Sequence, residues 1–413
     1  MSQQRHSRHS VVEGIPLPSL DPDHWPSAHE DRVLSPGQTP HTAADKNGPP
    51  SSRFRLRISA EVWRALQYVG ICVHFLSSPR PPSPSFTRVV PSVIARDVGH
   101  FMLQVYTPAG YAKAKAKGDA PFPVVVNFHG GGFTLGTGTD DARFARFVLE
   151  RCNAVFISVD YRLAPEFPFP TAVEDGADAL LYVIRNAADL HVDPHRIAIS
   201  GFSAGGNLAL TAPLRLHSYL KAQRAKLPPQ LEPEHKLVAV ASWYPVTNFT
   251  ISRAQRREWC KRPDRTLPPI LTDLFDASYL HPPTLDLADP HLSPAKASDE
   301  MLRDALPDNV IMYTCEWDML LREGEDFAGR LAAEPINKTM MYKEIDGVPH
   351  GWDKGPSPFS PPEGSEELYA ECCQRLKEIF EERSDPKVDG VDGAESIDRP
   401  RDVHVEFHTP IYE

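Results

Sequence analysis

Short apolar runs alternate with amphipathic, helix-like segments along most of the chain, and this alternation predicts the fold class. Runs rich in β-branched residues are expected to form strands. A preceding stretch, residues 86–105, alternates apolar and polar side chains and should supply the opening strands. Because strands that alternate with helices pair in parallel, the pattern predicts an α/β fold with a mostly parallel central sheet flanked by helices. The further expected strands are residues 123–128, 155–159, 197–200, 238–243, 310–314 and 340–345.

The helical segments carry signals of their own. Thr171, with Glu174 three positions later, matches a capping box and predicts a helix start. Pro213 should kink or end the helix that follows residues 197–200, because proline has no amide hydrogen to donate. Lysines that alternate with alanine over residues 113–117 favour a solvated loop. The apolar stripe of the helix after Thr171 consists of Val173, Ala177, Leu180, Leu181 and Ile184.

Composition separates a folded part from polar ends. Residues 1–52 are rich in Pro, Ser, His and charged residues, so we expect them to be disordered. Residues 53–383 should form the folded domain, and residues 384–413 a polar C-terminal tail. The segments near residues 56–80 and 250–294 do not fit the alternation of strands and helices. They are expected to form a helical cap that builds the substrate pocket.

Charge and cysteine content exclude some classes of function. The chain has 44 Lys and Arg against 55 Asp and Glu, a net charge of −11, which disfavours nucleic-acid binding because a phosphate backbone requires cationic contacts. The six cysteines show no metal-binding spacing and are expected to be reduced thiols. No apolar run follows residues 1–13, so we expect a cytoplasmic protein without a secretory signal. Residues 62–76, interrupted by Arg64 and His74, are too short to span a bilayer and should form a cap helix.

A candidate nucleophile lies between a predicted strand and a predicted helix. The pentapeptide Gly-Phe-Ser-Ala-Gly, residues 201–205, follows a β-branched run and precedes an alanine-rich helical pattern. A serine on such a sharp turn needs small neighbours, here Gly201 and Gly205, because the backbone is strained and the helix starts close to the strand. Ser203 is therefore the predicted nucleophile. The helix N-terminus favours the negative charge that acyl transfer generates.

A glycine triplet upstream supplies amides that could stabilise this charge. The expected strand at residues 123–128 runs into His129 and Gly130, and two more glycines follow. Glycines are needed because backbone amides must point at one substrate oxygen without side chains in the way. This is the oxyanion-loop pattern of lipases and esterases, in which His129 and Gly130 support the motif. The expected oxyanion donors are Gly131, Gly132 and Ala204.

A nucleophilic serine also needs a histidine base and a carboxylate that orients it, in the chain order serine, acid, histidine. Asp318 follows the strand expected at residues 310–314, and Glu316 and Asp346 are rival carboxylates. Asp318 is preferred because it lies just past the strand end. His350 is the expected base, because it combines a glycine-flanked loop, a late position in the chain and an apolar strand just before it.

These residues lie in blocks that resemble the signature blocks of the hormone-sensitive-lipase-like α/β-hydrolases. The resemblance spans roughly residues 121–382. It implies the α/β-hydrolase fold and esterase chemistry on short to medium acyl groups, with Ser203 as nucleophile, His350 as base and Asp318 as its partner. It implies neither a metal nor an organic cofactor. The blocks are His129-Gly-Gly-Gly-Phe133, Asp160-Tyr-Arg-Leu-Ala-Pro-Glu166, Asp193-Pro-His-Arg-Ile197, Gly201-Phe-Ser-Ala-Gly-Gly-Asn207 and Asp346-Gly-Val-Pro-His-Gly351.

Some positions depart from that family pattern. The family commonly carries an acidic residue before the nucleophile, where this chain has Phe202. It commonly carries a proline after the triad acid, where this chain has Met319, and an acidic residue a few positions on that is replaced around residues 321–323. These departures bear on the class of substrate more than on the type of reaction.

The expected substrate is a small-molecule ester, hydrolysed through an acyl-enzyme. An acyltransferase or an amidase would use the same residues, so both remain as alternatives. A non-catalytic ligand-binding relative is a further alternative, against which the retained His350 argues.

Overall fold

The computed structural model describes residues 52–224 and 234–382. The predicted tail at residues 384–413 lies outside these ranges, as does the predicted disordered segment at residues 1–52 except for Ser52. All candidate site residues lie within the described ranges.

The β-strands of the described residues form one sheet. They are β1 (Phe86–Pro91), β2 (His100–Tyr106), β3 (Phe122–Phe128), β4 (Val155–Asp160), β5 (Val192–Phe202), β6 (Leu237–Trp243), β7 (Asn309–Cys315) and β8 (Thr339–Ile345). Their order is β1-β2-β4-β3-β5-β6-β7-β8. The pairs from β4 to β8 are parallel, whereas β1 and β2 are antiparallel at one edge. The predicted α/β fold with a mostly parallel sheet is confirmed.

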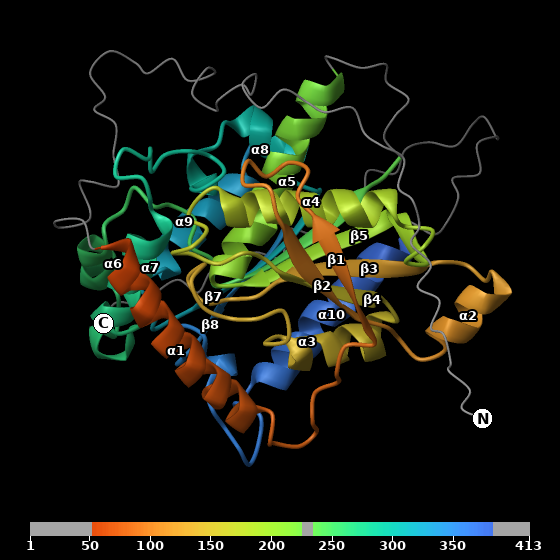
Figure 1. The fold of residues 1–413 in the computed structure, drawn as a ribbon, viewed down its shortest axis with the longest axis horizontal. Helices are drawn as coiled ribbons and strands as arrows, with labels where there is room; N and C mark the ends of the chain where they lie inside the picture. Colours follow the sequence, from red (N-terminus) through yellow and green to blue (C-terminus); the bar gives the residue numbers. More distant parts are fainter. Residues whose placement is uncertain (1–51, 225–233, 383–413) are drawn as a thin grey trace, which may run out of the picture. The chain divides into compact units, whose positions relative to one another are not determined.

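Helices cover both faces of this sheet. The α-helices of the described residues are α1 (Arg53–His74), α2 (Tyr111–Lys117), α3 (Ala142–Phe147), α4 (Thr171–Arg185), α5 (Ala204–Arg224), α6 (Arg253–Trp259), α7 (Pro269–Tyr279), α8 (Asp299–Ala305), α9 (Leu321–Ala332) and α10 (Ser365–Glu381). Figure 1 shows α4 and α5 on one face and α3 and α10 on the other. The first helix, α1, packs beside α7 (Figure 1).

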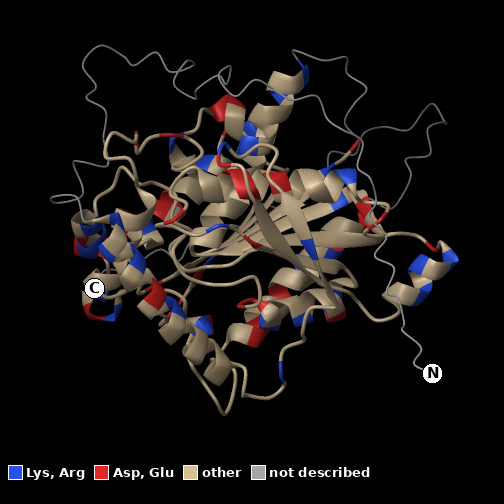
Figure 2. Ribbon diagram, in the orientation of Figure 1, with Lys and Arg blue, Asp and Glu red and all other residues tan. Residues whose placement is uncertain are grey.

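The core lies on both faces because successive side chains of a strand point to opposite sides. In β3, Val124 and Val126 pack with residues of α4 and α5, whereas Val125 packs with residues of α3 and α10; all three are fully buried. Strands that are covered on both faces consist of continuous apolar runs, and for this reason the apolar runs of the sequence predicted their positions. Figure 2 shows most charged residues on helices and loops rather than on the strands.

The strand order brings together the loops that carry the candidate residues. β3 pairs with β4 on one side and with β5 on the other, and Phe128 at the end of β3 lies opposite Gly201 of β5. Parallel strands have their carboxyl ends at the same edge of the sheet, and a crevice forms where the strand order changes direction. The loops that follow β3, β5, β7 and β8 therefore meet at this edge.

One predicted loop is a helix, and one helix continues past a proline expected to kink or end it. The loop predicted at residues 113–117 is helical, because alanine and lysine are both strong helix formers, and Gly118 ends α2 in the left-handed conformation with φ of 72°. The lysine side chains are exposed, so the prediction that they are solvated holds. Pro213 lies inside α5, which continues to Arg224, so the helix does not end there. Burial of Pro213 in the core favours this continuation.

The predicted capping box at the start of α4 is absent. The hydroxyl of Thr171, the first residue of the helix, donates to Asp97 Oδ2 at 3.1 Å. Glu174 accepts from the amide of Arg96 at 3.0 Å and from the guanidinium of Arg215 at 3.1 Å. Partners from distant parts of the chain have therefore replaced the local hydrogen bonds that the spacing suggested.

The first helix, α1, is bound to the domain through polar side chains. Arg53 Nη1 donates to the carbonyls of Ala277 and Ser278 in α7 at 3.2 and 3.1 Å. Apolar side chains of α1 remain exposed, namely Phe54, Ile58, Val62, Leu66 and Val69. None of the helices in the described ranges combines the length and the apolar character needed to cross a membrane.

His74, the last residue of α1, joins this helix to two other parts of the domain. Its Nε2 accepts from Arg143 Nε of α3 at 3.0 Å, and its Nδ1 donates to the carbonyl of Gly355 at 3.1 Å. Burial, with the nearby charges of Lys354 and Arg143, lowers the pKa of His74 to about 4. The ring is therefore neutral at neutral pH, and protonation would place a second donor against Arg143.

His74 should make the fold sensitive to acid. Its folded-state pKa of about 4 lies below the ordinary value of 6.5, so its stabilisation is complete above pH 6.5 and is lost as the pH falls toward 4. We expect the free energy of unfolding in urea to fall more between pH 7 and pH 5 in the wild type than in His74→Gln. His100→Gln changes an exposed histidine and should keep the wild-type dependence. An unchanged dependence in His74→Gln would contradict the assignment.

Candidate active site

Ser203 lies on a tight turn between β5 and α5. Its backbone is left-handed, with φ of 56°, which is uncommon for a residue with a side chain. The amide of Ser203 donates to the carbonyl of Trp243 at 2.8 Å. A Cβ at Gly201 would lie 2.0 Å from the carbonyl oxygen of Gly205, and a Cβ at Gly205 would lie 1.9 Å from that of Phe128. No side chain fits at either position, which is the physical reason for the two glycines.

The structure brings the predicted serine, histidine and aspartate into one line of hydrogen bonds. Ser203 Oγ lies 2.7 Å from His350 Nε2, and His350 Nδ1 lies 2.5 Å from Asp318 Oδ2. The side chains of His350 and Asp318 are only 7% and 2% exposed. The other carboxylate oxygen of Asp318 accepts from the amide of Leu320 at 3.0 Å. This second bond fixes the carboxylate, which in turn fixes the imidazole ring.

The rival carboxylates have other partners. Glu316 accepts from the amide of Gly347 at 2.7 Å and from Lys261 at 3.3 Å, and the Gly347 amide holds the pKa of Glu316 below its ordinary value. Asp346 is exposed. Of the three candidates, Asp318 is the one that the structure pairs with His350.

The loop after β3, residues 129–134, is called here the glycine loop, and it lies beside Ser203. A Cβ at Gly130 would lie 3.5 Å from Ser203 Cβ. Gly131, Gly132 and Phe133 have φ of 117°, 60° and 59°, so successive residues take conformations that favour glycine. Within the described ranges, no backbone oxygen accepts from the amides of Gly131 or Gly132. These donors are therefore available to a ligand.

The amide of Ala204 is a further donor at this place. Ala204 is the first residue of α5, and a helix leaves its first amides without internal acceptors. The predicted donors thus come from two sides of Ser203, with Gly131 and Gly132 on the glycine loop and Ala204 at the start of the helix.

His129 packs against the glycine loop and takes no part in the line of hydrogen bonds at Ser203. Its ring stacks on Tyr161, with centroids 4.2 Å apart, and the Tyr161 hydroxyl donates to the carbonyl of His129 at 2.8 Å. Its Nδ1 lies 2.8 Å from the carbonyl oxygen of Gly130. A Cβ at Gly136 would lie 2.4 Å from the same nitrogen, so the chain closes tightly around this ring.

Sequence reasoning missed the residues that pack behind His350. The ring of Tyr244 meets the His350 ring edge to face, with centroids 4.9 Å apart. Its hydroxyl donates to Asp353 Oδ1 at 2.6 Å, and burial raises the pKa of Tyr244 well above its ordinary value. The charged pair Asp353 and Lys354, soon after His350, marked that segment in the sequence, but no feature of the sequence marked Tyr244.

Phe202, at the position where the resembling family carries an acid, lies against a half-buried cation. Lys354 Nζ lies 3.7 Å from the centre of the Phe202 ring, and it pairs with Asp141 at 2.8 Å and with Asp353 at 3.2 Å. Burial alone would lower the pKa of Lys354, but these two carboxylates raise it well above its ordinary value. The space behind the serine turn is therefore charged although residue 202 is apolar.

Part of the segment predicted as a cap covers the glycine loop. A Cβ at Gly132 would lie 2.3 Å from the ring of Phe275, so this ring of α7 packs directly on the loop. The Tyr279 ring stacks on Phe133, with centroids 3.9 Å apart. A cavity of about 530 Å³ borders Asp318 and is lined also by residues of α9.

Comparisons with known proteins agree with the fold. A family model described as alpha/beta hydrolase fold matches residues 125–354. The chain is 29% identical over 283 residues to an AB hydrolase superfamily protein of Schizosaccharomyces pombe, which covers 67% of this chain and 79% of that protein. It is 30% identical over 257 residues to an arylesterase of Saccharolobus solfataricus, covering 62% of this chain and 75% of that one.

A further relative is the carboxylesterase NlhH of Mycobacterium tuberculosis, 37% identical over 221 residues. That match covers 52% of this chain and 62% of NlhH, less than two thirds of its length. Among solved structures, a hyperthermophilic esterase from the archaeon Pyrobaculum calidifontis superposes with a TM-score of 0.61 at 28% identity. The superposition covers 82% of this chain and 95% of that esterase.

The close contact at Gly205 predicts a strong effect on stability. Gly205→Ala should destabilise the protein by more than about 3 kcal/mol, the upper end of ordinary overpacking, because the clash is with backbone that cannot rotate away. Gly329→Ala in α9 is the matched control, since no atom lies within 4 Å of its Cβ position. It should be neutral or stabilising by up to about 1 kcal/mol, because alanine favours helix. Equal free energies of unfolding in urea for the two variants would contradict the prediction.

Proposed function

The chain belongs to the alpha/beta hydrolase fold family, and from that premise we propose that it is a serine carboxylic-ester hydrolase that works through an acyl-enzyme. The proposed substrates are short to medium acyl or small-metabolite esters. The observation that carries the proposal is the 2.7 Å distance between Ser203 Oγ and His350 Nε2, because a serine nucleophile needs its base within hydrogen-bonding reach. The relatives named as a carboxylesterase and an arylesterase support the proposal that the hydrolysed bond is an ester.

In the first half of the proposed reaction, Ser203 Oγ forms a bond to the carbonyl carbon of the ester while its proton passes to His350 Nε2. The electron pair of the carbonyl moves to its oxygen. When the pair returns, the bond to the alcohol oxygen breaks, and the alcohol takes the proton from His350. Asp318 stabilises the charged imidazole throughout, since it accepts from Nδ1 at 2.5 Å.

In the second half, water attacks the acyl-enzyme and gives a proton to His350. The carboxylic acid leaves, and Ser203 regains its proton. The tetrahedral intermediates of both halves carry a negative oxygen, which the amides of Gly131, Gly132 and Ala204 would stabilise. Each such donor is worth on the order of 3 kcal/mol in comparable sites.

The nucleophile Ser203 provides the first test of the proposed function. Ser203→Ala should lower kcat for a p-nitrophenyl ester of a short acid by on the order of 10⁴-fold to 10⁶-fold, because the nucleophile is gone. Labelling by a fluorophosphonate probe should disappear with it. Substantial remaining turnover by the purified variant would refute the role of Ser203, and product analysis with an added alcohol separates hydrolysis from acyl transfer.

The choice between the carboxylates provides a second test. Asp318→Asn should lower kcat by on the order of 10⁴-fold, because the amide no longer holds the required tautomer of His350. Glu316→Gln is the matched control on the same loop and should retain near wild-type turnover, since Glu316 bonds Gly347 and Lys261 instead. A larger loss in Glu316→Gln than in Asp318→Asn would reverse the assignment.

The ring of Phe275 provides a test of the proposed cap. Because it packs on Gly132, Phe275→Ala should open space beside the oxyanion donors. We expect the ratio of kcat/KM for long over short acyl esters to rise by on the order of tenfold, as a few added methylenes can deliver. Ile270→Ala, an exposed change on the same helix, should leave the acyl-length profile as it is. An unchanged profile in Phe275→Ala would remove this ring from the substrate pocket.

A further inference from the structure

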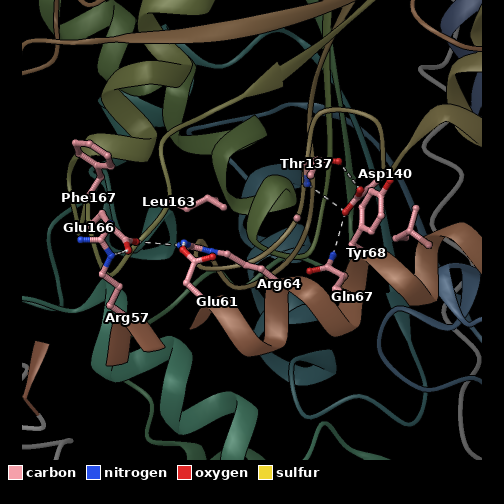
Figure 3. A pocket seen from close by; sticks show the side chains of 12 residues that line it. Arg57, Glu61, Arg64, Gln67, Tyr68, Thr137, Asp140, Leu163, Glu166 and Phe167 are labelled. Atoms are coloured by element: carbon pink, nitrogen blue, oxygen red, sulfur yellow. Dashed lines mark hydrogen bonds and ion pairs between the residues drawn. The ribbon is translucent and has the colours of Figure 1, made fainter. Parts of the chain in front are cut away.

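One side chain of α1, Arg64, reaches the glycine loop. Arg64 Nε donates to the carbonyl oxygen of Thr134 at 2.9 Å, and Nη2 donates to that of Ala164 at 2.8 Å. Its charge is balanced by Glu61 at 2.7 Å and by Glu166 at 3.1 Å (Figure 3). The guanidinium therefore bridges two backbone segments that lie far from it in the sequence.

The first of these segments holds the expected oxyanion donors. Thr134 is fully buried. Its amide donates to the carbonyl of Gly131 at 3.1 Å, and its hydroxyl donates to the carbonyl of Gly132 at 3.1 Å. Because a peptide unit is planar, the orientation of the Gly131 carbonyl sets the direction of the Gly132 amide in the same plane. The Gly131 carbonyl also accepts from the amide of Leu135 at 2.8 Å, so Thr134 and Leu135 together aim the donor of Gly132. Arg64 holds the carbonyl of Thr134, which lies in the same peptide unit as the Leu135 amide.

The second segment contacts the loop at Phe133, the residue before Thr134. The amide of Ala164 donates to the carbonyl of Phe133 at 2.9 Å. Phe133 has φ of 59°, a conformation that is strained for a residue with a side chain and persists only where its surroundings enforce it. Arg64 binds the carbonyls of both Ala164 and Thr134. It therefore connects the hydrogen-bond partner of this strained residue with the residue that follows it in the chain.

We propose that Arg64 is a positioning residue for the oxyanion donors, above all for the amide of Gly132. The proposal rests on the proposed function of the glycine loop. A planar guanidinium with several donors can bind two carbonyls at a fixed angle, which a single ammonium cannot do. The preceding peptide unit of the loop has a different partner, because the carbonyl of Gly130 lies 2.8 Å from the His129 ring. The role assigned to Arg64 is therefore directed to the amide of Gly132. The site of Arg64 also borders a cavity of about 440 Å³ (Figure 3).

The test compares three arginines of the same helix. Arg64→Met should lower kcat for a short-chain ester by on the order of tenfold to hundredfold, because a small misplacement of a donor is costly. KM should stay within about twofold, since the donors act on the transition state. Arg53→Met loses the bonds to the carbonyls of Pro165, Ala277 and Ser278, and Arg57→Met loses the ion pair with Glu166, but neither change removes a bond to the glycine loop. Both should retain wild-type kcat.

A second measurement separates positioning from a general loss of structure. Sulfur is larger than oxygen and a weaker hydrogen-bond acceptor, so a thionoester gains less from aligned amides than the matching ester does. The wild type should prefer the oxygen ester, and Arg64→Met should lose most of that preference. Arg64→Lys, which keeps the charge but has one donor nitrogen in place of the forked guanidinium, should fall between the two.

Three results would decide the matter. If Arg64→Met keeps wild-type kcat and the wild-type preference for the oxygen ester, Arg64 has no positioning role. If Arg53→Met loses as much kcat as Arg64→Met, the docking of α1 as a whole explains the effect and the proposal is overturned. If the wild type neither turns over esters nor reacts with a fluorophosphonate, the proposed function itself fails, a result distinct from the other two.

Discussion

The left-handed turn at Ser203 is the constraint on which the site depends. The amide of this residue is tied to the carbonyl of Trp243 in β6, and the start of the following helix approaches the backbone of β3 more closely than any side chain would allow. These contacts lock the serine between neighbouring strands of the sheet. The sheet therefore determines the position of the serine side chain. The loops after β7 and β8 bring Asp318 and His350 to that position.

A second layer of polar contacts keeps those loops in place. Tyr244 supports the His350 ring and also binds Asp353, which pairs with the half-buried Lys354. Lys354 lies over Phe202, immediately before the serine. The resembling family commonly places an acid at that position, whereas here a cation neutralised by two carboxylates occupies the space behind the turn. Paired charged side chains therefore take the place of a single acidic side chain.

The sequence predicted what depends on local pattern. Buried parallel strands are continuous apolar runs, and a tight strand-to-helix turn requires glycines, so the sheet and the position of Ser203 followed from residue order. The capping box at Thr171 failed because Asp97 and Arg215, distant in the chain, compete for the same side chains. Tyr244 and Arg64 could not be singled out for the same reason. Their partners are set by how elements pack, and no spacing rule in the sequence records that.

The contacts of Arg64 with the glycine loop have one further consequence. Both of its acceptors there are main-chain carbonyls, which every amino acid possesses. Position 134 supplies its own amide and hydroxyl to the loop, but position 164 contributes nothing except peptide groups to this arrangement. A change of residue 164 would keep these peptide groups, but Ala164 is fully buried in the core, so a larger side chain would overpack it, and no other amino acid reproduces a forked, permanently charged donor at position 64. Substitution is therefore opposed at both ends of the contact, by core packing at position 164 and by hydrogen-bond geometry at position 64.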